Sequence, residues 1–207
     1  AASSDYPLRD VYKRQAMWSQ GTAVSLDTSD QVSPGFRAAW KRDDLSARVW
    51  ARWTSLGLLF FAEVRDDVFD QSFDGGAMWQ GDSLQLAFDV DNAGGKGYGP
   101  RVYELLIGKG KNGDQVFKGM GFPESGPLRA GAVAVVRDEQ AKTTCYEFTI
   151  PRAELPGLEA LDATRVFGLS MLDKDSEGGG RESDRAGGSA IGAGRDAAAF
   201  GDLFLVK

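Results

Sequence analysis

Apolar residues recur along the chain in short segments, several of which alternate with polar residues. In Ser83–Val90, Leu84, Leu86 and Phe88 occupy every second position, so they would face one side of a strand. Nine segments rich in Val, Leu, Phe and Trp, bounded by Gly, Asp, Asn or Pro, are expected to be strands. They are Ala23–Leu26, Ala47–Trp53, Gly57–Val64, Ser83–Val90, Val102–Ile107, Ala132–Val136, Thr144–Ile150, Phe167–Leu172 and Asp202–Val206.

Helical periodicity is weak, and only Pro151–Leu155 and Ala197–Phe200 are expected to form a turn each. Many short strands with almost no helix predict an all-β fold, an antiparallel β-sandwich with a jelly-roll-like or immunoglobulin-like arrangement of two sheets. Three glycine-rich segments are expected to be long loops, where binding sites are usually built. These are Asn92–Gly99, Lys109–Gly113 and Glu177–Gly194.

The length of 207 residues suits one all-β domain. Ala1–Gln15 is poorly patterned and is expected to be a lead-in or expression-derived segment, with residues 16–207 forming a single module. The longest apolar run, Leu56–Ala62, is far shorter than the roughly 20 residues that cross a bilayer, so no membrane partner is expected. A secreted location would require that a signal peptide had been removed.

Charge and residue usage exclude several classes of function. The net charge is −6 and charges of both signs are interspersed, so no basic face for nucleic acid is expected. The chain has no histidine, which removes Ser/His and Cys/His triads and His-ligated zinc or haem. A haem held by methionine alone is not expected either. The single cysteine, Cys145, excludes an internal disulfide and is expected to be a buried thiol.

Trp79 and Asp82 form the strongest local candidate for ligand binding. Trp79 precedes the alternating strand Ser83–Val90, and Asp82 follows it by three residues. An exposed indole matches the C–H face of a pyranose, and a nearby carboxylate accepts hydrogen bonds from sugar hydroxyls. In the alternative interpretation, Trp79 belongs to the core and Asp82 caps a turn; the spacing alone does not separate the two.

Two other pairs of side chains are candidates for a role at a site. Asp66 and Asp67 are adjacent on a strand, so they should face opposite ways and make a poor catalytic pair. Trp50 and Trp53 are three positions apart and should also face opposite sides. One of them is expected in the core, and Trp53, nearer the strand end, is the better candidate for exposure and ligand contact.

A possible calcium site lies in the segment Leu172–Gly178. Asp173, Asp175 and Glu177 alternate before a glycine run, as oxygen ligands do at the start of a calcium loop. A solvated acidic loop is the alternative, because a later bidentate acid is not clearly placed. A structural calcium ion is therefore a secondary expectation.

The order of the motifs is more specific than any one of them. The ordered segments are Trp18 with Ala23–Leu26, Ala47–Trp53, Leu58–Phe69, Trp79–Asp89, Phe148–Pro151, Phe167–Asp175 and Gly192–Lys207. Together they resemble the family-9 carbohydrate-binding modules over nearly the whole chain from Trp18. The resemblance implies a β-sandwich attached to a secreted glycoside hydrolase, notably a xylanase, that binds polysaccharides such as xylan or cellulose; some members carry calcium.

The resemblance also implies roles for individual residues. The family stacks a sugar between two tryptophans with arginines nearby; Trp79 matches the first tryptophan and Arg181 one arginine. Where the second tryptophan is expected, this chain has Ala193-Gly194, and Glu104 falls at the position of another arginine. One wall of the aromatic sandwich is therefore missing, which should weaken binding unless another group replaces it.

The function implied is a non-catalytic module that targets a secreted polysaccharide-degrading enzyme to its glycan. The first alternative is a structural or interaction module with a degenerate sugar site. A glycoside hydrolase domain is the less favoured alternative, because no two acids are spaced in a way that demands chemistry.

Overall fold

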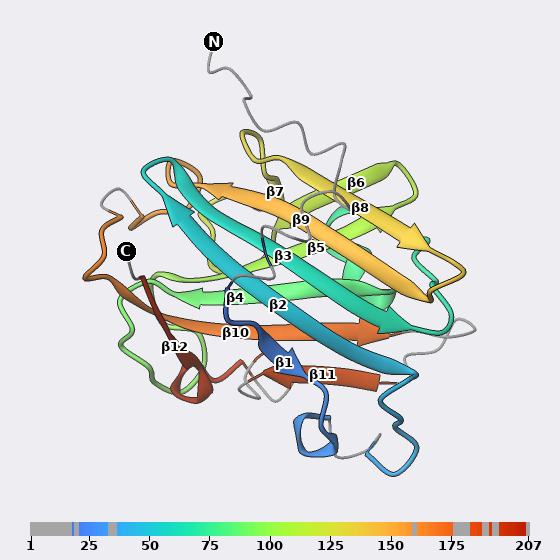
Figure 1. Cartoon of the computed structure of the whole chain (residues 1–207). Helices are drawn as coiled ribbons and strands as arrows, with labels where there is room; N and C mark the ends of the chain where they lie inside the picture. The colour runs from blue at the N-terminus through green and yellow to red at the C-terminus, as the bar shows by residue number, and fades with distance from the viewer. Residues whose placement is uncertain are drawn as a thin grey trace.

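A computed structural model describes residues 18, 21–32, 37–158, 161–175, 183–187, 191 and 195–205, with the main chain only at 172–175 and 183–187. Two antiparallel sheets lie face to face (Figure 1). One is five-stranded with the order β1-β2-β3-β9-β8, and the other is seven-stranded with the order β11-β10-β4-β5-β6-β7, where β12 also pairs with β10. The expected all-β sandwich is confirmed.

The strands of the first sheet are β1 (Val24–Leu26), β2 (Leu45–Thr54), β3 (Gly57–Asp66), β8 (Val133–Asp138) and β9 (Thr143–Pro151). Those of the second are β4 (Ser83–Asp89), β5 (Val102–Gly110), β6 (Gly113–Lys118), β7 (Gly126–Pro127), β10 (Val166–Asp175), β11 (Ser183–Gly187) and β12 (Gly201–Phe204). Three short 3₁₀ helices are η2 (Ser29–Gln31), η3 (Gly75–Gln80) and η5 (Ala197–Ala199). No helix in this described part of the chain is long and apolar enough to span a bilayer.

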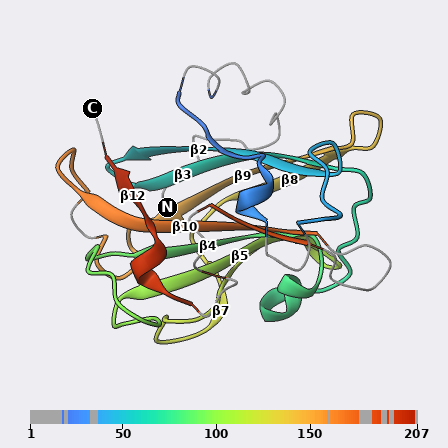
Figure 2. The ribbon, with the colours of Figure 1, turned by 90° about the horizontal axis from the view of Figure 1, so that it is seen from below.

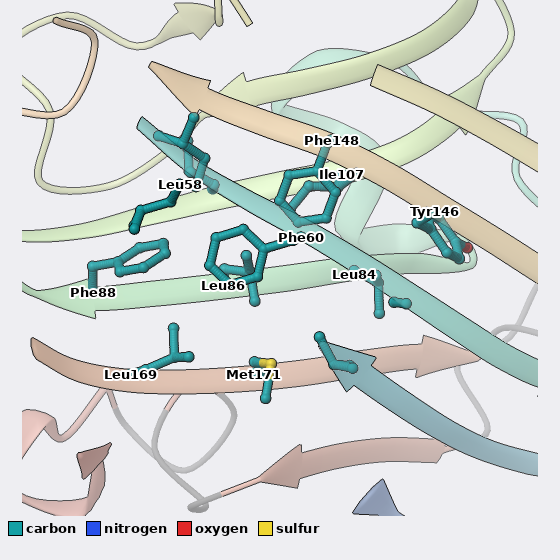
Figure 3. Packing of buried hydrophobic residues seen from close by; sticks show 14 of the residues in the cluster. Leu58, Phe60, Leu84, Leu86, Phe88, Ile107, Tyr146, Phe148, Leu169 and Met171 are labelled. Carbon is teal, nitrogen blue, oxygen red and sulfur yellow. The ribbon is translucent and has the colours of Figure 1, made fainter. Parts of the chain in front are cut away.

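The space between the sheets is filled by the apolar residues of the alternating pattern. Leu84, Leu86 and Phe88 of β4 are all buried in this core. Phe60 of β3 crosses the gap, with its ring 5.2 Å from that of Phe148 and 5.9 Å from that of Phe88 (Figure 3). One core therefore joins both sheets, as expected when each sheet buries one face.

The outer face of the five-stranded sheet carries a second, smaller apolar cluster. Trp18 is 1% exposed and stacks on Phe61 at 5.9 Å, next to Trp50 and the buried thiol of Cys145. Trp53 packs instead against the core between the sheets. The prediction that Trp50 and Trp53 face opposite ways is confirmed, and so is the buried thiol.

Several predictions of loops and turns were wrong. In Lys109–Gly113, the first two residues belong to β5 and the last to β6, so only Lys111 and Asn112 form the turn of this hairpin. Strand β11 lies within the expected long loop Glu177–Gly194. Pro151–Leu155 forms non-helical turns. The two glycine-rich segments belong to hairpins, β5–β6 and β10–β11, whose strands continue through glycine and polar residues that carry little strand propensity.

Candidate functional site

Helix η3 carries Trp79 on the outer face of the seven-stranded sheet. Its Met78 is fully buried, and Ser83 Oγ at the start of β4 donates a hydrogen bond of 3.0 Å to the Met78 carbonyl. Trp79, the next residue, is 45% exposed. The indole makes no hydrogen bond or ring contact with any other described residue. Nearly half of this side chain is thus open to solvent.

The segment before η3 is held against it by Gln71. The Gln71 Nε2 donates to the carbonyls of Met78 at 2.9 Å and Asp82 at 3.0 Å. Its Oε1 accepts from the Phe73 amide at 2.9 Å. One side chain therefore satisfies three main-chain groups around the helix, which fixes the path of the chain on both sides of Trp79.

Asp82 is 3% exposed and bonded to the neighbouring loop. Its carboxylate accepts a short hydrogen bond from the Asp70 amide, and its own amide donates to the Asp70 carbonyl at 3.0 Å. This is the turn-holding role that was the alternative to sugar contact for Asp82. For Trp79, the exposure rules out the alternative of a core residue.

Buried polar side chains line the outer face of the same sheet. They are Ser83, Gln85 and Asp89 of β4, Glu104 of β5 and Ser170 of β10. Figure 2 shows η3 and η5 below this sheet, at opposite ends of it. The alternation of β4 places Gln85 on the side away from Leu84 and Leu86, so the sequence pattern itself carries a signal for this residue.

Glu104 lies on this face opposite Ala87, toward the end of β4, whereas η3 precedes the start of β4. It is 5% exposed, accepts a 3.1 Å hydrogen bond from the Tyr98 hydroxyl, and lies 3.6 Å from the Arg195 Nε. Burial, followed by the negative charge of Glu104, raises the pKa of Tyr98, so the hydroxyl stays protonated and donates. Arg195 follows Ala193-Gly194 closely, so the structure brings a cation to Glu104.

Trp53 lies far from Trp79. It is partly buried and lines a hollow of about 220 Å³ with Leu58 and Phe204, at the end where β2 meets the C-terminal strand β12. Helix η3 precedes the start of β4, whereas β12 pairs with β10 beside the end of β4. Trp53 and Trp79 therefore belong to opposite ends of the sandwich (Figure 1).

A larger hollow, of about 290 Å³, lies on the five-stranded sheet, and none of the predicted ligand residues lines it. It is lined by arginines and acids that already form ion pairs, such as Arg42 with Asp27 at 2.8 Å. Asp66 is buried and Asp67 exposed at the end of β3, in agreement with opposite orientations.

Comparison with known proteins supports the fold. No protein-family model and no curated protein matches the chain. Among solved structures, a family-9 carbohydrate-binding module from Caldicellulosiruptor kristjanssonii in complex with cellotriose matches with a TM-score of 0.66 and 14% identity, over 92% of this chain and 85% of that one. A family-9 module from the same organism in complex with glucose matches with a TM-score of 0.66 and 15% identity, over 91% of this chain and 86% of that one. A candidate carbohydrate-binding protein from Bacteroides uniformis matches with a TM-score of 0.60 and 12% identity, over 98% of this chain and 94% of that one.

The fold is that of the family-9 carbohydrate-binding modules. The two-sheet arrangement that the sequence resemblance implied is therefore confirmed over most of the chain. Within this family-9 fold, Trp79, Gln85 and Glu104 all belong to the outer side of one sheet.

Some residues with expected roles lie outside the described residues. They are Arg181 and Ala193-Gly194, whose roles come from the family-9 resemblance, and Glu177, a candidate calcium ligand from the spacing of acids. For Asp173 and Asp175 the main chain is described: both belong to β10, where they pair with Arg185 and Ser183 of β11. Among the residues that the structure describes, no cluster of acids or Cys fits a metal ion.

Proposed function

We propose that this chain is a non-catalytic module that binds an oligosaccharide or polysaccharide, with a sugar ring stacked on Trp79. The observation that carries the proposal is the exposure of Trp79 on a well-bonded helix at the edge of a polar sheet face. The neighbouring structures with this fold were solved with cellotriose and glucose, which favours a glucan or a related β-linked glycan.

The chemistry of the face suits a sugar. The indole offers an apolar surface to the C–H groups of a pyranose, while buried polar residues such as Gln85 and Glu104 offer groups that bond to hydroxyls. Binding pockets of this kind combine an apolar wall with a few placed polar groups. Arg181 is proposed as a further contact from the adjacent loop, and Asp82 as a support that acts through the turn.

Trp79→Ala tests the proposal. Loss of an aromatic stack removes about 1–3 kcal/mol, so retention on xylan or hydroxyethylcellulose in affinity electrophoresis should fall roughly ten- to a hundredfold. The melting temperature should hardly change, because the indole is exposed. Phe204→Ala, which removes another exposed aromatic at the opposite end, is the matched control and should bind as the wild type does. Equal retention by Trp79→Ala and the wild type would contradict the proposal.

The proposal extends to the setting of the module. We place it in a secreted protein, linked to a glycoside hydrolase that it holds near its substrate, as the family resemblance implies. A structural calcium ion bound by Asp173, Asp175 and Glu177 is also part of the proposal, with a test given in the Discussion.

A further inference from the structure

Asp74 forms a clasp between the helix that carries Trp79 and the β5–β6 hairpin. Its Oδ1 accepts hydrogen bonds from the Asn112 amide at 3.0 Å and from Gln115 Nε2 at 2.6 Å. Its Oδ2 accepts from Asn112 Nδ2 at 2.5 Å. Gln115 returns a contact, since its Oε1 accepts from the Gly75 amide at 2.9 Å. Asp74 is the residue immediately before η3, so the clasp holds the start of the helix.

Packing around the clasp leaves little room for movement. Gly75 has a φ of 56°, and a Cβ there would lie 3.1 Å from the ring of Phe117, which lies on β6. A Cβ at Gly110 would collide with the Asp74 carboxylate. Both positions therefore favour glycine for a close approach. The helix begins in one defined position against the hairpin.

The clasp and Gln71 hold η3 from two sides. Gln71 bonds to the last turn, through the Met78 carbonyl, whereas Asp74 fixes the first. Trp79 directly follows Met78, and its indole makes no hydrogen bond or ring contact with another described residue. Its orientation must therefore come from the helix that carries it.

From this geometry we propose that Asp74 is the positioning residue of Trp79: by clasping Asn112 and Gln115 it holds the indole in the orientation that receives a sugar. The sugar-binding purpose of this positioning rests on the proposed function, but the effect of Asp74 on Trp79 can be measured without a ligand. A carboxylate suits the role because all three of its partners are donors. Without the clasp, the helix would sample other positions, and the apparent affinity would fall by the fraction of time that Trp79 is misplaced.

Fluorine NMR of protein labelled with fluorotryptophan gives a direct test. The five tryptophans should give five resonances, and Trp79→Phe assigns one of them. In Asp74→Ala the Trp79 resonance should narrow and move toward that of the free amino acid, while the other four stay in place. An unchanged Trp79 resonance in the folded variant would overturn the proposal.

Two further variants make the result unambiguous. Gln115→Ala removes one donor to Asp74 and the acceptor of the Gly75 amide, so it should change the Trp79 resonance as Asp74→Ala does. If Asp74→Ala fails to fold, the spectrum of Gln115→Ala decides whether the clasp positions Trp79. Asp162→Ala is the matched control: this carboxylate closes a turn with Thr164 before β10, at the other end of the sheet. It should leave Trp79 unaffected.

Titration with cellotriose adds the functional readout. If the clasp keeps Trp79 in place nine-tenths of the time or more and its loss reduces this to about a tenth, affinity falls roughly tenfold. Asp74→Ala that binds cellotriose as tightly as the wild type would overturn the positioning role. If instead neither the wild type nor Trp79→Ala binds any glycan, the proposed function fails, while the fluorine spectra still decide whether Asp74 positions Trp79.

Discussion

Asp66 is a carboxylate buried at the end of β3. It is 3% exposed, its Oδ1 accepts a 3.0 Å hydrogen bond from the Val68 amide, and the Arg137 Nη1 lies 3.9 Å from its Oδ2. Burial raises the pKa of Asp66 to about 6, because desolvation of the charged form outweighs the hydrogen bond and the arginine. These contacts give Asp66 the environment of a structural group rather than a catalytic one.

The raised pKa predicts a pH dependence of stability. The folded state binds the Asp66 proton more tightly than the unfolded state does, so the stabilisation is fully present below about pH 4 and is lost as pH rises to about 6. Between pH 4 and 7, Asp66→Asn should therefore gain up to about 3 kcal/mol of unfolding free energy relative to the wild type. Urea unfolding at several pH values measures this difference.

Asp67→Asn provides the comparison for this prediction. It removes the same charge from the adjacent, exposed residue, whose negative charge also raises the pKa of Asp66. Asp67→Asn should therefore gain much less stability than Asp66→Asn, because burial is the larger cause. Parallel stability curves for Asp66→Asn and the wild type would show that the buried carboxylate does not titrate in this range.

The β2–β3 hairpin is the longest pairing in the five-stranded sheet, from Leu45 opposite Asp66 to Thr54 opposite Gly57. β3 also pairs with β9 on its other side. At Gly57 the two pairings meet, because a Cβ there would collide with the Ile150 carbonyl and approach the Pro151 main chain of β9. A glycine is required here for the close approach of backbone rather than for a special φ.

Gly57→Ala should therefore destabilise the sheet by about 1–3 kcal/mol or more, since the added methyl group has to displace backbone. Thermal unfolding measures the loss as a lower melting temperature. Gly99→Ala is the control, because a Cβ at Gly99 meets no atom within 4 Å. If both variants melt at the same temperature, the strands can separate more easily than the packing indicates.

The two sheets of the sandwich share one core between them. An ion that binds only the folded chain therefore stabilises the whole folded state. By this linkage, the proposed calcium ion at Asp173, Asp175 and Glu177 should raise the melting temperature as the free calcium concentration rises above its Kd. Calorimetry in calcium and in chelator measures the shift. Asp175→Ala should abolish it, and identical melting curves for the wild type in the two buffers would exclude the ion.

The sequence by itself determined the class of fold and offered Trp79 as a candidate ligand residue, but it left open whether the indole is exposed. The alternation of Leu84, Leu86 and Phe88 requires a strand with one buried face, whatever its partners are, because side chains alternate along any strand. Trp79 could be chosen as a ligand residue because it stands apart from this pattern. The absence of histidine excluded histidine-dependent triads and metal sites whatever the fold is.

Only the tertiary structure decided how Trp79 is held and which polar residues share its face. Asp74 contacts Asn112 and Gln115, about forty positions away, and no local pattern specifies such a pairing. Likewise, only the structure shows that the Asp70 amide and the Tyr98 hydroxyl donate hydrogen bonds to the carboxylates of Asp82 and Glu104. Hydrogen bonds between distant segments depend on sheet order and register, which pairing across the whole molecule establishes.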